Sequence, residues 1–485
     1  SNFRRAASSY DICVWRPVYG AVYQRDPNHS EILLPLSVSG SEKQSENRRR
    51  ERSMIGIMFI IFALFLALGI PIAFSVGWAT LSVHLMNPAF TCDAEYFFKT
   101  MVNGMDSYVL LAIPLFMLSS SIMAESGMSN RLFDFFSYFF GNIAAGLPIA
   151  VVITCLFYGA ICGSGPATVA AIGTMCIPLL TRLGYERDFV TAMIAVSGGL
   201  GVIIPPSIPF ITYGLATGAS IGDLFIAGFA PGILIALCLI AYIIYYFSRR
   251  DNSCLQIAQN TKTLRKKGFI NIFKESFFAL LAPVIILGGI YGGIVSPTEA
   301  ACVSVVYALL VGVFVYRAIN LKTLSTCLID TARTATPVML ILSVCIVFGR
   351  VLTILNLPQT LAAYVVGHVQ SKIVVLLVIN IFLLFAGMVM DTVPCILILS
   401  PIMLPIVQQY GVDPIHFGVL MTVNLAIGFV TPPIGTNLFV ANSLTQIPIT
   451  RIAKHALPFI AMFLLALMMI TYIPQITMFL PNLLG

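Results

Sequence analysis

The sequence predicts an all-α protein that crosses a membrane many times and contains two inverted repeats, each with a re-entrant hairpin and a broken helix. Hydrophobic residues make up 58% of the 485 positions and charged residues only 10%, whereas a soluble domain carries about 25% charged residues. Apolar runs of about 20 residues, the length that spans hydrocarbon, recur along the chain. A Gly followed four positions later by Pro-Pro occurs twice, at 201–206 and 428–433.

The duplicated motif indicates an internal repeat. Pro432 lies 227 residues after Pro205, and the same offset relates two other pairs, Pro178 with Pro405 and Gly184 with Gly411. One Pro-Pro pair is explained by a simple kink, but two pairs at one offset are typical of the discontinuous helices of secondary transporters. Backbone freed by such a break is tolerated at membrane depth only inside protein or beside water.

The remaining composition argues against several other classes of protein. The net charge of +7 comes from basic loops beside apolar spans, the positive-inside pattern, so we predict no nucleic-acid partner. Eleven cysteines without paired spacing and five scattered histidines favour buried thiols over a disulfide framework or a zinc site. The sequence contains no Walker motif and therefore does not predict ATP hydrolysis.

We divide the chain into five parts. Residues 1–53 are polar and without periodicity, so we expect them to be disordered or not native to a protein that begins near Met54. The other four parts are a first inverted repeat at 54–247, a basic cytoplasmic loop at 248–274, a linking span at 275–295 and a second inverted repeat at 296–485.

Each repeat is expected to contain four spans and one hairpin. The expected spans of the first repeat are 55–83, 107–125, 189–217 and 224–247, and its hairpin arms are 146–161 and 166–183, with the tip at 163–165. The second repeat is expected to have spans from Ser296 onward and at 331–352, 417–443 and 456–473, an interfacial segment at 356–370, and hairpin arms at 373–389 and 392–409. A linking span at 277–295 brings the total to nine spans.

Positive charges set the predicted orientation. Residues 248–274 hold seven Lys or Arg and are placed in the cytoplasm. The first hairpin then has its base inside and the second has its base outside, with the N-terminus cytoplasmic and the C-terminus periplasmic. Arg350 is the exception to the rule, because it falls near the outer end of its span.

Two sodium sites are predicted where a hairpin tip can meet a helix break. Carbonyl groups at the end of a half-helix suit a bare cation, and free N–H groups suit a carboxylate. Site 1 comprises Gly163, Ser164, Gly165, Ser197, Gly198, Gly201 and Pro205, and site 2 comprises Met390, Asp391, Thr392, Gly428, Thr431, Pro432 and Gly435. We expect sodium as the coupling ion and no other metal or cofactor.

Four residues are candidates to face the substrate, namely Asp391, Asn424, Asn437 and Ser197. An ionisable group at membrane depth is functional by default, yet Asp391 also fits an N-cap before Val393-Pro394. The asparagines equally fit a role in satisfying broken backbone. Two other acidic residues are expected to have structural roles. Glu299 completes a capping box with Ser296, and Asp330 forms an interfacial ion pair with Arg333.

Several stretches resemble the large membrane subunit of a tripartite ATP-independent periplasmic (TRAP) transporter. They are Ser164–Gly173, Ser197–Ile208, Pro297–Ala301, Asp413–Gly418 and Thr431–Gly435. Within that family the chain is most similar to the four-carbon dicarboxylate branch, on the stretches Asn437–Ala441, Thr471–Gln475 and Leu480–Leu484. The resemblance covers about Met54 to Gly485, and residues 1–53 match nothing in it.

The resemblance implies sodium-coupled import of a carboxylate across the bacterial inner membrane by an elevator movement, with no enzymatic activity. The implied partners are a small four-helix membrane subunit, a periplasmic substrate-binding protein and membrane lipid. The sodium sites of the family lie at the hairpin tips and facing helix breaks, as in the two sites above. Sialic acid or sugar-acid import and a sodium/dicarboxylate carrier working alone remain alternatives, and a membrane-embedded enzyme would need a catalytic constellation that the spans lack.

Overall fold

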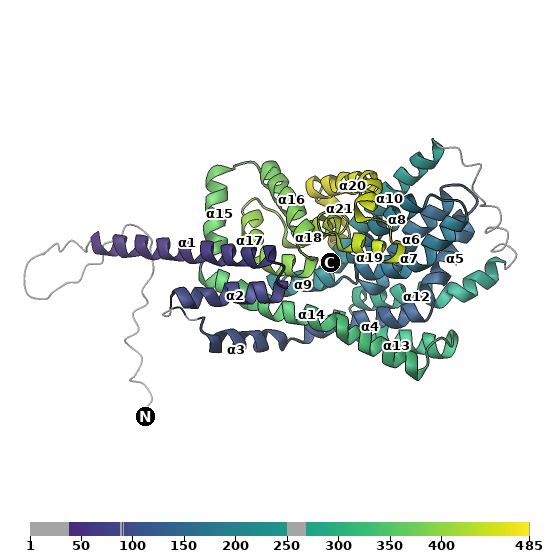
Figure 1. The fold of residues 1–485 in the computed structure, drawn as a ribbon, viewed down its shortest axis with the longest axis horizontal. Helices are drawn as coiled ribbons and strands as arrows, with labels where there is room; N and C mark the ends of the chain where they lie inside the picture. Colours follow the sequence, from purple (N-terminus) through teal and green to yellow (C-terminus); the bar gives the residue numbers. More distant parts are fainter. Residues whose placement is uncertain (1–37, 88–89, 91, 250–267, 485) are drawn as a thin grey trace, which may run out of the picture. The chain divides into compact units, whose positions relative to one another are not determined.

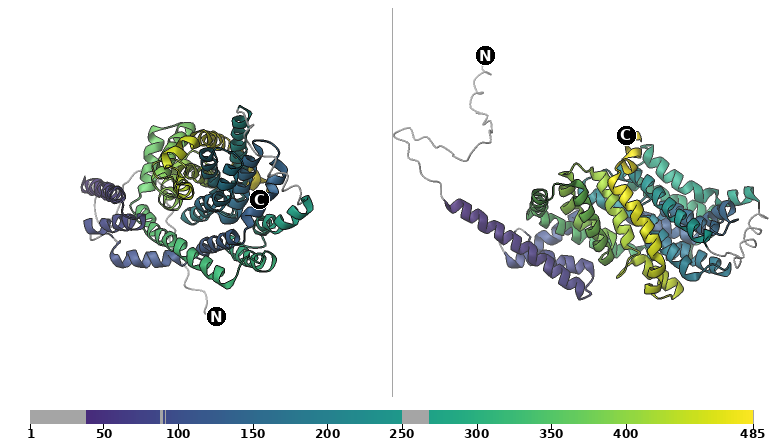
Figure 2. Two further views of the ribbon diagram at one scale, coloured as in Figure 1. Left: turned by 45° about the vertical axis from the view of Figure 1, so that its right-hand side comes forward. Right: turned by 90° about the horizontal axis from the view of Figure 1, so that it is seen from above.

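The computed structural model describes residues 38–87, 90, 92–249 and 268–484, and these residues form helices and connecting turns without any strand (Figures 1 and 2). The predicted all-α class is confirmed. Of the unit Ser1–Arg50, the described part is the beginning of α1 (Val38–Ala67), and all further description concerns the unit Glu51–Gly485. Most of the polar segment 1–53 and of the basic loop 248–274 lies outside the described residues.

The first repeat contains the predicted hairpin and broken helix. Hairpin 1 consists of α6 (Gly146–Cys162) and α7 (Gly165–Arg182), and the broken helix consists of α8 (Arg187–Ser197), the 3-10 turn η2 (Gly198–Val202) and α9 (Ile208–Thr217). The other elements are α2 (Ile72–Met86), α3 (Ala94–Met105), η1 (Tyr108–Leu111), α4 (Ala112–Glu125), α5 (Met128–Phe140) and α10 (Ile221–Ser248).

The second repeat has the same plan and follows the linking helix α12 (Phe269–Tyr291). Hairpin 2 consists of α16 (Lys372–Val389) and α17 (Thr392–Gln408), and its broken helix consists of α18 (Pro414–Gly428) and α19 (Thr436–Thr445). The other elements are α13 (Pro297–Leu310), the π-helical η3 (Val311–Val315), α14 (Leu321–Ile354), α15 (Leu357–His368), α20 (Ile449–Tyr472) and α21 (Gln475–Leu484). The predicted hairpin arms are confirmed to within two residues.

Seven helices within the described residues are long and apolar enough to cross a membrane. They include one hairpin arm, α16, and three of the nine expected spans are broken into shorter helices. The breaks at 198–207 and 429–435 were predicted, but the continuous span expected at 55–83 is wrong. Helix α1 ends at Ala67 because Gly69 takes a positive φ of 77° and Pro71 caps the next helix, a conformation and a residue that a helix interior does not accept.

Helix α20 shows that the two hairpins are inverted. Near its N-terminus, Arg451 forms an ion pair with Asp188, just after hairpin 1. Near its C-terminus, the Tyr472 hydroxyl donates a hydrogen bond to the carbonyl of Ile373 at the start of hairpin 2 (3.3 Å). Because a helix of 24 residues is about 36 Å long, the bases of the hairpins lie on opposite faces of the membrane-spanning body.

A second group of helices lies beside the hairpins. Helix α14 packs on α2, α3 and α4, and α13 packs on α4 (Figure 1). The 34 residues of α14 extend about 51 Å, more than the ~30 Å of hydrocarbon, and exceed the expected span of 331–352 at both ends. Since α14 also packs on α17, it connects this group to hairpin 2. The capping box of Ser296 and Glu299 at the start of α13 is confirmed, as is the exposed Arg333–Asp330 pair of α14 (3.4 Å).

The close packing of the second break predicts intolerance of any side chain at Gly428. A Cβ atom there would lie 2.4 Å from the carbonyl carbon of Gly387 in hairpin 2, so we expect Gly428→Ala to destabilise the protein by about 1–3 kcal/mol. Gly288→Ala is the matched control, because it lies within a helix with nothing within 4 Å of its added Cβ, and should be neutral or slightly stabilising. Thermal unfolding in detergent checks both, and equal midpoints would contradict the packing described.

Candidate functional site

At site 1, the tip of hairpin 1 lies directly against the first helix break. Gly163 ends α6 with a φ of 62°, and its carbonyl accepts a hydrogen bond from the N–H of Ile208 (3.5 Å). A Cβ atom at Gly201 would lie 2.9 Å from the carbonyl oxygen of Ser164. The glycines therefore allow two backbone segments to approach more closely than side chains permit, and the structure brings the two predicted halves of site 1 together.

The carbonyl group of Ser164 is held in place by its own hairpin. It accepts hydrogen bonds from the N–H and the hydroxyl of Thr168 (3.1 and 2.8 Å) and from the thiol of Cys162 (3.3 Å). The sequence analysis did not select Thr168 or Cys162. Their signal was local, because Ser and Thr near the start of a helix bond back to the preceding turn.

Asn437 enters site 1 from the second repeat. Its side-chain Nδ2 donates a hydrogen bond to the carbonyl of Ala195 (2.9 Å). A Cβ atom at Gly165 of the hairpin tip would lie 3.2 Å from its Oδ1, and one at Gly198 of the break would lie 3.3 Å from its Nδ2. The side chain thus fills the space between tip and break, beside Ser197.

Two oxygen atoms at this place lack a protein partner. Asn437 Oδ1 and Ser197 Oγ are both fully buried and have no hydrogen bond within the described part of the chain. A buried acceptor without a partner is costly, and a hard cation that prefers oxygen ligands would satisfy it. The residues of site 1 therefore fit a sodium ion. Pro205, by contrast, lies within the buried stretch 201–210 and contributes packing around the site.

Site 2 is built on the same plan but is less enclosed. The N–H of Ile434, within the break, donates a hydrogen bond to the carbonyl of Met388 near the hairpin tip (3.2 Å). Asp391 is the N-cap of α17 and accepts a hydrogen bond from the N–H of Thr392 (2.8 Å). The side chain of Asp391 is exposed, so its capping bond leaves carboxylate lone pairs for a ligand.

The other members of site 2 surround this tip and break. Met390 is half-buried, Gly428 contacts Gly387, and the hydroxyl of Thr431 donates to the carbonyl of Ile427 (2.8 Å). Gly435 takes a positive φ of 56° before α19. Both Pro-Pro bonds, Pro205–Pro206 and Pro432–Pro433, are cis. The whole stretch 201–210 is buried, whereas Pro433 and Ile434 are exposed, so the two sites differ in access.

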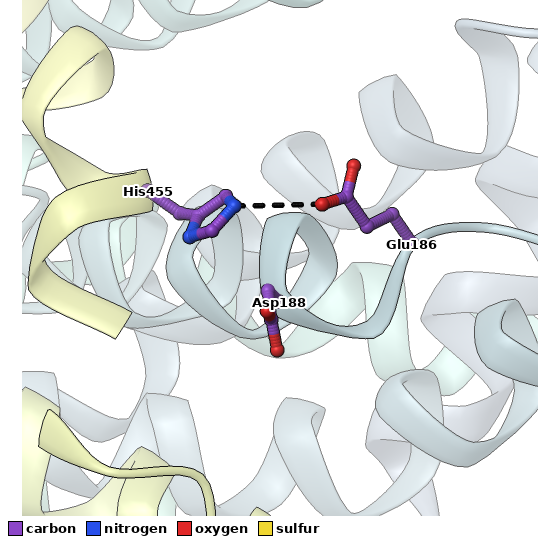
Figure 3. Close-up of side chains that lie close together, drawn as sticks. All are labelled: Glu186, Asp188 and His455. Atoms are coloured by element: carbon purple, nitrogen blue, oxygen red, sulfur yellow. Dashed lines mark ion pairs between the residues drawn. The ribbon is translucent and has the colours of Figure 1, made fainter. Parts of the chain in front are cut away.

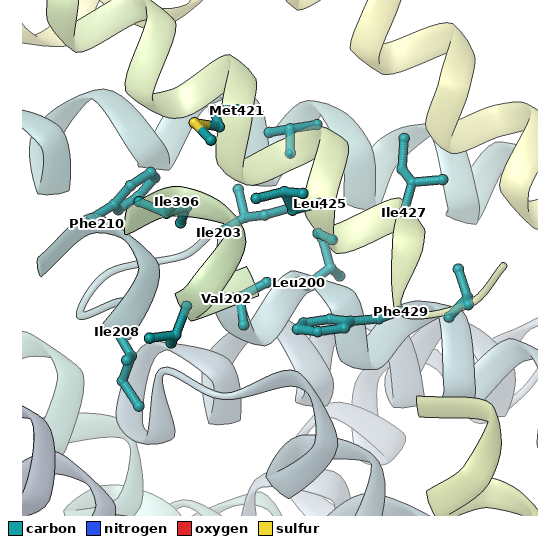
Figure 4. Packing of buried hydrophobic residues seen from close by; sticks show 14 of the residues in the cluster. Leu200, Val202, Ile203, Ile208, Phe210, Ile396, Met421, Leu425, Ile427 and Phe429 are labelled. Atoms are coloured by element: carbon teal, nitrogen blue, oxygen red, sulfur yellow. The ribbon is translucent and has the colours of Figure 1, made fainter. Parts of the chain in front are cut away.

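A hydrophobic layer joins the two breaks (Figure 4). Leu200, Val202 and Ile203 of the first break belong to one cluster with Leu425 of α18 and Phe429 of the second break. Tyr213 also donates a hydrogen bond across the repeats, to the carbonyl of Pro414 (2.8 Å). The two broken helices are therefore held together by packed side chains and a hydrogen bond between the repeats.

Asn424 lies apart from both hairpin tips in a buried polar chain. Its Nδ2 donates to Asn380 Oδ1 of α16 (2.8 Å), and Asn380 Nδ2 donates to the hydroxyl of Thr471 in α20 (2.9 Å). These contacts tie α16, α18 and α20 together within the membrane-spanning body. Asn424 Oδ1 has no partner among the described residues. A substrate-facing role for Asn424 stays a prediction, and the visible role of its Nδ2 is structural.

Glu186, Asp188 and His455 form a separate cluster of possible metal ligands (Figure 3). Asp188 pairs with Arg451, His455 Nε2 lies 3.4 Å from Glu186 Oε1, and the Tyr246 hydroxyl donates to Glu186 Oε2 (3.1 Å). Arg451 of α20 therefore neutralises Asp188 in α8, and His455 of the same helix contacts Glu186 just before α8. This arrangement is an ion-paired link between the repeats.

Two opposed hairpins that meet two broken helices in an all-helical membrane body define a multi-pass membrane transporter. A solved structure supports the fold: the YdaH transporter of Alcanivorax borkumensis, described as having an unusual topology, superimposes with a TM-score of 0.58 at 13% identity and covers 79% of this chain and 89% of its own.

The sequence defines the family more narrowly. Residues 59–476 match the family described as tripartite ATP-independent periplasmic transporter, DctM component, and the chain belongs to this family. The resemblance to TRAP large membrane subunits is thus confirmed, and the relatives are transporter permeases and not enzymes.

Three relatives show the range of the family. The isethionate TRAP transporter permease protein DctMQ of Oleidesulfovibrio alaskensis is 42% identical over 423 residues, which are 87% of this chain and 66% of that protein. The C4-dicarboxylate TRAP transporter large permease protein DctM of Pseudomonas aeruginosa is 41% identical and covers 78% of this chain and 88% of its own. The sialic acid TRAP transporter large permease protein SiaM of Vibrio cholerae is 33% identical over a region that covers 89% of this chain and 99% of that protein.

The buried asparagine chain predicts coupling between Asn380 and Asn424. Asn424→Leu alone leaves Asn380 Oδ1 without its donor, and Asn380→Leu alone removes one of the two acceptors of Asn424 Nδ2, the other being the carbonyl of Leu420. Each change should cost about 1–3 kcal/mol of stability. The double variant should cost less than the sum of the two, because it removes both partners. Unfolding midpoints of the four proteins in detergent check this, and strictly additive losses would show that the two side chains do not interact.

Proposed function

We propose that the chain is the large permease subunit of a sodium-coupled importer of small organic anions. The observation that carries the proposal is the pair of buried, unpartnered oxygens, Asn437 Oδ1 and Ser197 Oγ, between a hairpin tip and a helix break. Neutral oxygen ligands hold a sodium ion with little net charge, so the ion can leave again. Asp391 and the backbone around Thr431 would supply the second ion site.

The inverted plan suits alternating access by an elevator movement. The group of α2, α3, α4, α13 and α14 would act as the scaffold, and the hairpins with their broken helices would move as one body. The hydrophobic layer between the breaks supports this division, because it couples both sites into one packed unit. Half-helix N-termini at the breaks carry positive dipole ends that favour a carboxylate.

A four-carbon dicarboxylate is the substrate that we favour, from the similarity of the C-terminal stretches and of Asn437–Ala441 to that branch. Relatives that are 33–42% identical to this chain are named as transporters of isethionate, C4-dicarboxylates and sialic acid. All of these named substrates are anions. Binding-protein-dependent sialic acid or sugar-acid import and a stand-alone sodium/dicarboxylate carrier are the alternatives.

The tripartite character of the family suggests the partners, and the positions of basic residues suggest the orientation. We infer a small four-helix membrane subunit, a periplasmic binding protein that delivers the substrate, and residence in the bacterial inner membrane. Arg187 and Arg451 lie near each other at the base of hairpin 1. Arg187 donates a hydrogen bond to the carbonyl of Thr445, and Arg451 forms an ion pair with Asp188. The positive-inside rule counts Lys and Arg whatever their acidic partners, so these two arginines favour that face as cytoplasmic, with the N-terminus inside and the C-terminus outside.

Uptake into proteoliposomes tests the proposal directly. The chain is reconstituted with its small membrane partner and candidate binding proteins, and uptake of a panel of organic acids is measured with inward sodium or potassium gradients. Sodium-dependent uptake of a dicarboxylate that requires the binding protein is expected. Uptake without added binding protein favours the stand-alone carrier, and equal uptake in potassium contradicts sodium coupling.

Asp391→Asn separates charge from capping at site 2. Asn caps a helix as well as Asp does, so the fold should survive while sodium-dependent uptake falls about tenfold or more, the scale of a lost charged contact of about 1.5–3 kcal/mol. Asp413→Asn is the matched control, because Asp413 caps α18 by accepting from Ile415 N–H (2.7 Å). Uptake of Asp391→Asn at the level of the Asp413 control, with the same sodium requirement, would remove Asp391 from the ion site.

A further inference from the structure

A cavity of about 560 Å³ lies between α3, the C-terminal part of α14, the end of α9 and the second arm of hairpin 2. Its wall includes Tyr96, Asn103, Arg350, Thr353, Leu397 and Pro401. None of the residues proposed for the two sodium sites lines it. The volume falls within the ~300–1,000 Å³ of small-molecule sites, so the cavity has room for an organic anion of a few carbon atoms.

Arg350 is the one Lys or Arg side chain on this wall, and no Asp or Glu lines it. Over the ranges that the structure describes, Arg350 forms no ion pair, whereas Arg333 on the same helix pairs with Asp330. Arg350 is also the exception to the positive-inside distribution. The Arg350 side chain is exposed, and without a protein counter-ion its N–H donors are available to an anion that enters the cavity.

A second cavity lies beside the second arm of hairpin 1. It has a volume of about 380 Å³ and is lined by α7, the start of α8 and the end of α19. The 227-residue offset relates Thr174 on its wall to Pro401 on the wall of the first cavity. The charged residues that line it are Arg182 and Arg187, again without an acidic residue. Each hairpin thus has a positively charged hollow beside its second arm, and the hairpin bases face opposite sides.

We propose that Arg350 binds the anionic group of the substrate in the first cavity, before the substrate reaches the hairpin tips. A guanidinium offers paired N–H donors that match the oxygens of a carboxylate or a sulfonate. The side-chain amide of Asn103 adds a neutral donor on the same wall. The inference rests on the proposed function only in taking an organic anion as the transported molecule; it requires no sodium.

Charge-selective labelling tests the cavity without transport. Thr353→Cys places a thiol on the wall, where Thr353 is exposed. In proteoliposomes, its rates of modification by anionic sulfonatoethyl methanethiosulfonate and by the cationic trimethylammonium analogue are compared, with the unsubstituted chain as the baseline for native cysteines. Adding Arg350→Gln should lower the anionic-to-cationic rate ratio about fivefold, the scale of removing one nearby charge. Adding the control Arg333→Gln should leave the ratio within about twofold.

Protection by anions tests binding itself. Choline succinate or choline isethionate, compared with choline chloride at equal ionic strength, should slow modification of Thr353→Cys and lose this effect with Arg350→Gln. Protection by succinate alone identifies a carboxylate ligand, and protection by isethionate alone identifies a sulfonate. An unchanged rate ratio, or no protection by either anion, overturns the inference. Protection that persists while uptake shows no sodium dependence would contradict the coupling proposal and leave Arg350 as an anion site.

Discussion

The central constraint on this protein is that a helix broken at membrane depth must find partners for its free backbone groups inside the protein. At the first break, those partners are the tip of hairpin 1 and Asn437, and at the second break they are Gly387, Met388 and the tip of hairpin 2. The glycines at these points are required because the backbones approach to distances that a Cβ atom would block. Each break therefore exists only together with its hairpin.

The same constraint creates the chemistry. When two backbone segments and a few small polar side chains pack closely, some oxygens find no protein donor among the described residues, as Ser197 Oγ and Asn437 Oδ1 do not. In the function that we propose, a monovalent cation would resolve this deficit and its departure would restore it. Under this proposal, coupling between the ion and the conformation would need no dedicated switch, because the ion would complete a packing arrangement whose buried oxygens otherwise lack partners.

The sequence predicted the parts of the fold that depend on local signals. The hairpin arms, the capping box at Ser296 and the N-cap at Asp391 follow from Gly, Pro and capping residues within a few positions. The break at Gly69–Pro71 was missed because those residues interrupt an apolar run only briefly. Helices α3 and α5 were not predicted, because each is shorter than a membrane span. Asn437 was predicted to face the substrate and not to belong to site 1. An internal repeat shows which positions of the two halves correspond, but it does not show which residues become neighbours when the chain folds. Its position beside Gly165 is a tertiary contact between repeats.

Sodium binding at the first break is the central claim, and hydrogen exchange measures it most directly. Amide exchange in peptides that cover 163–168 and 198–202 is compared in sodium chloride and potassium chloride at equal ionic strength, with α12 as an internal reference. The account predicts that sodium slows exchange in both peptides, because the ion joins the tip to the break, while exchange in α12 is unchanged. Equal exchange of the two peptides in sodium and potassium would contradict it.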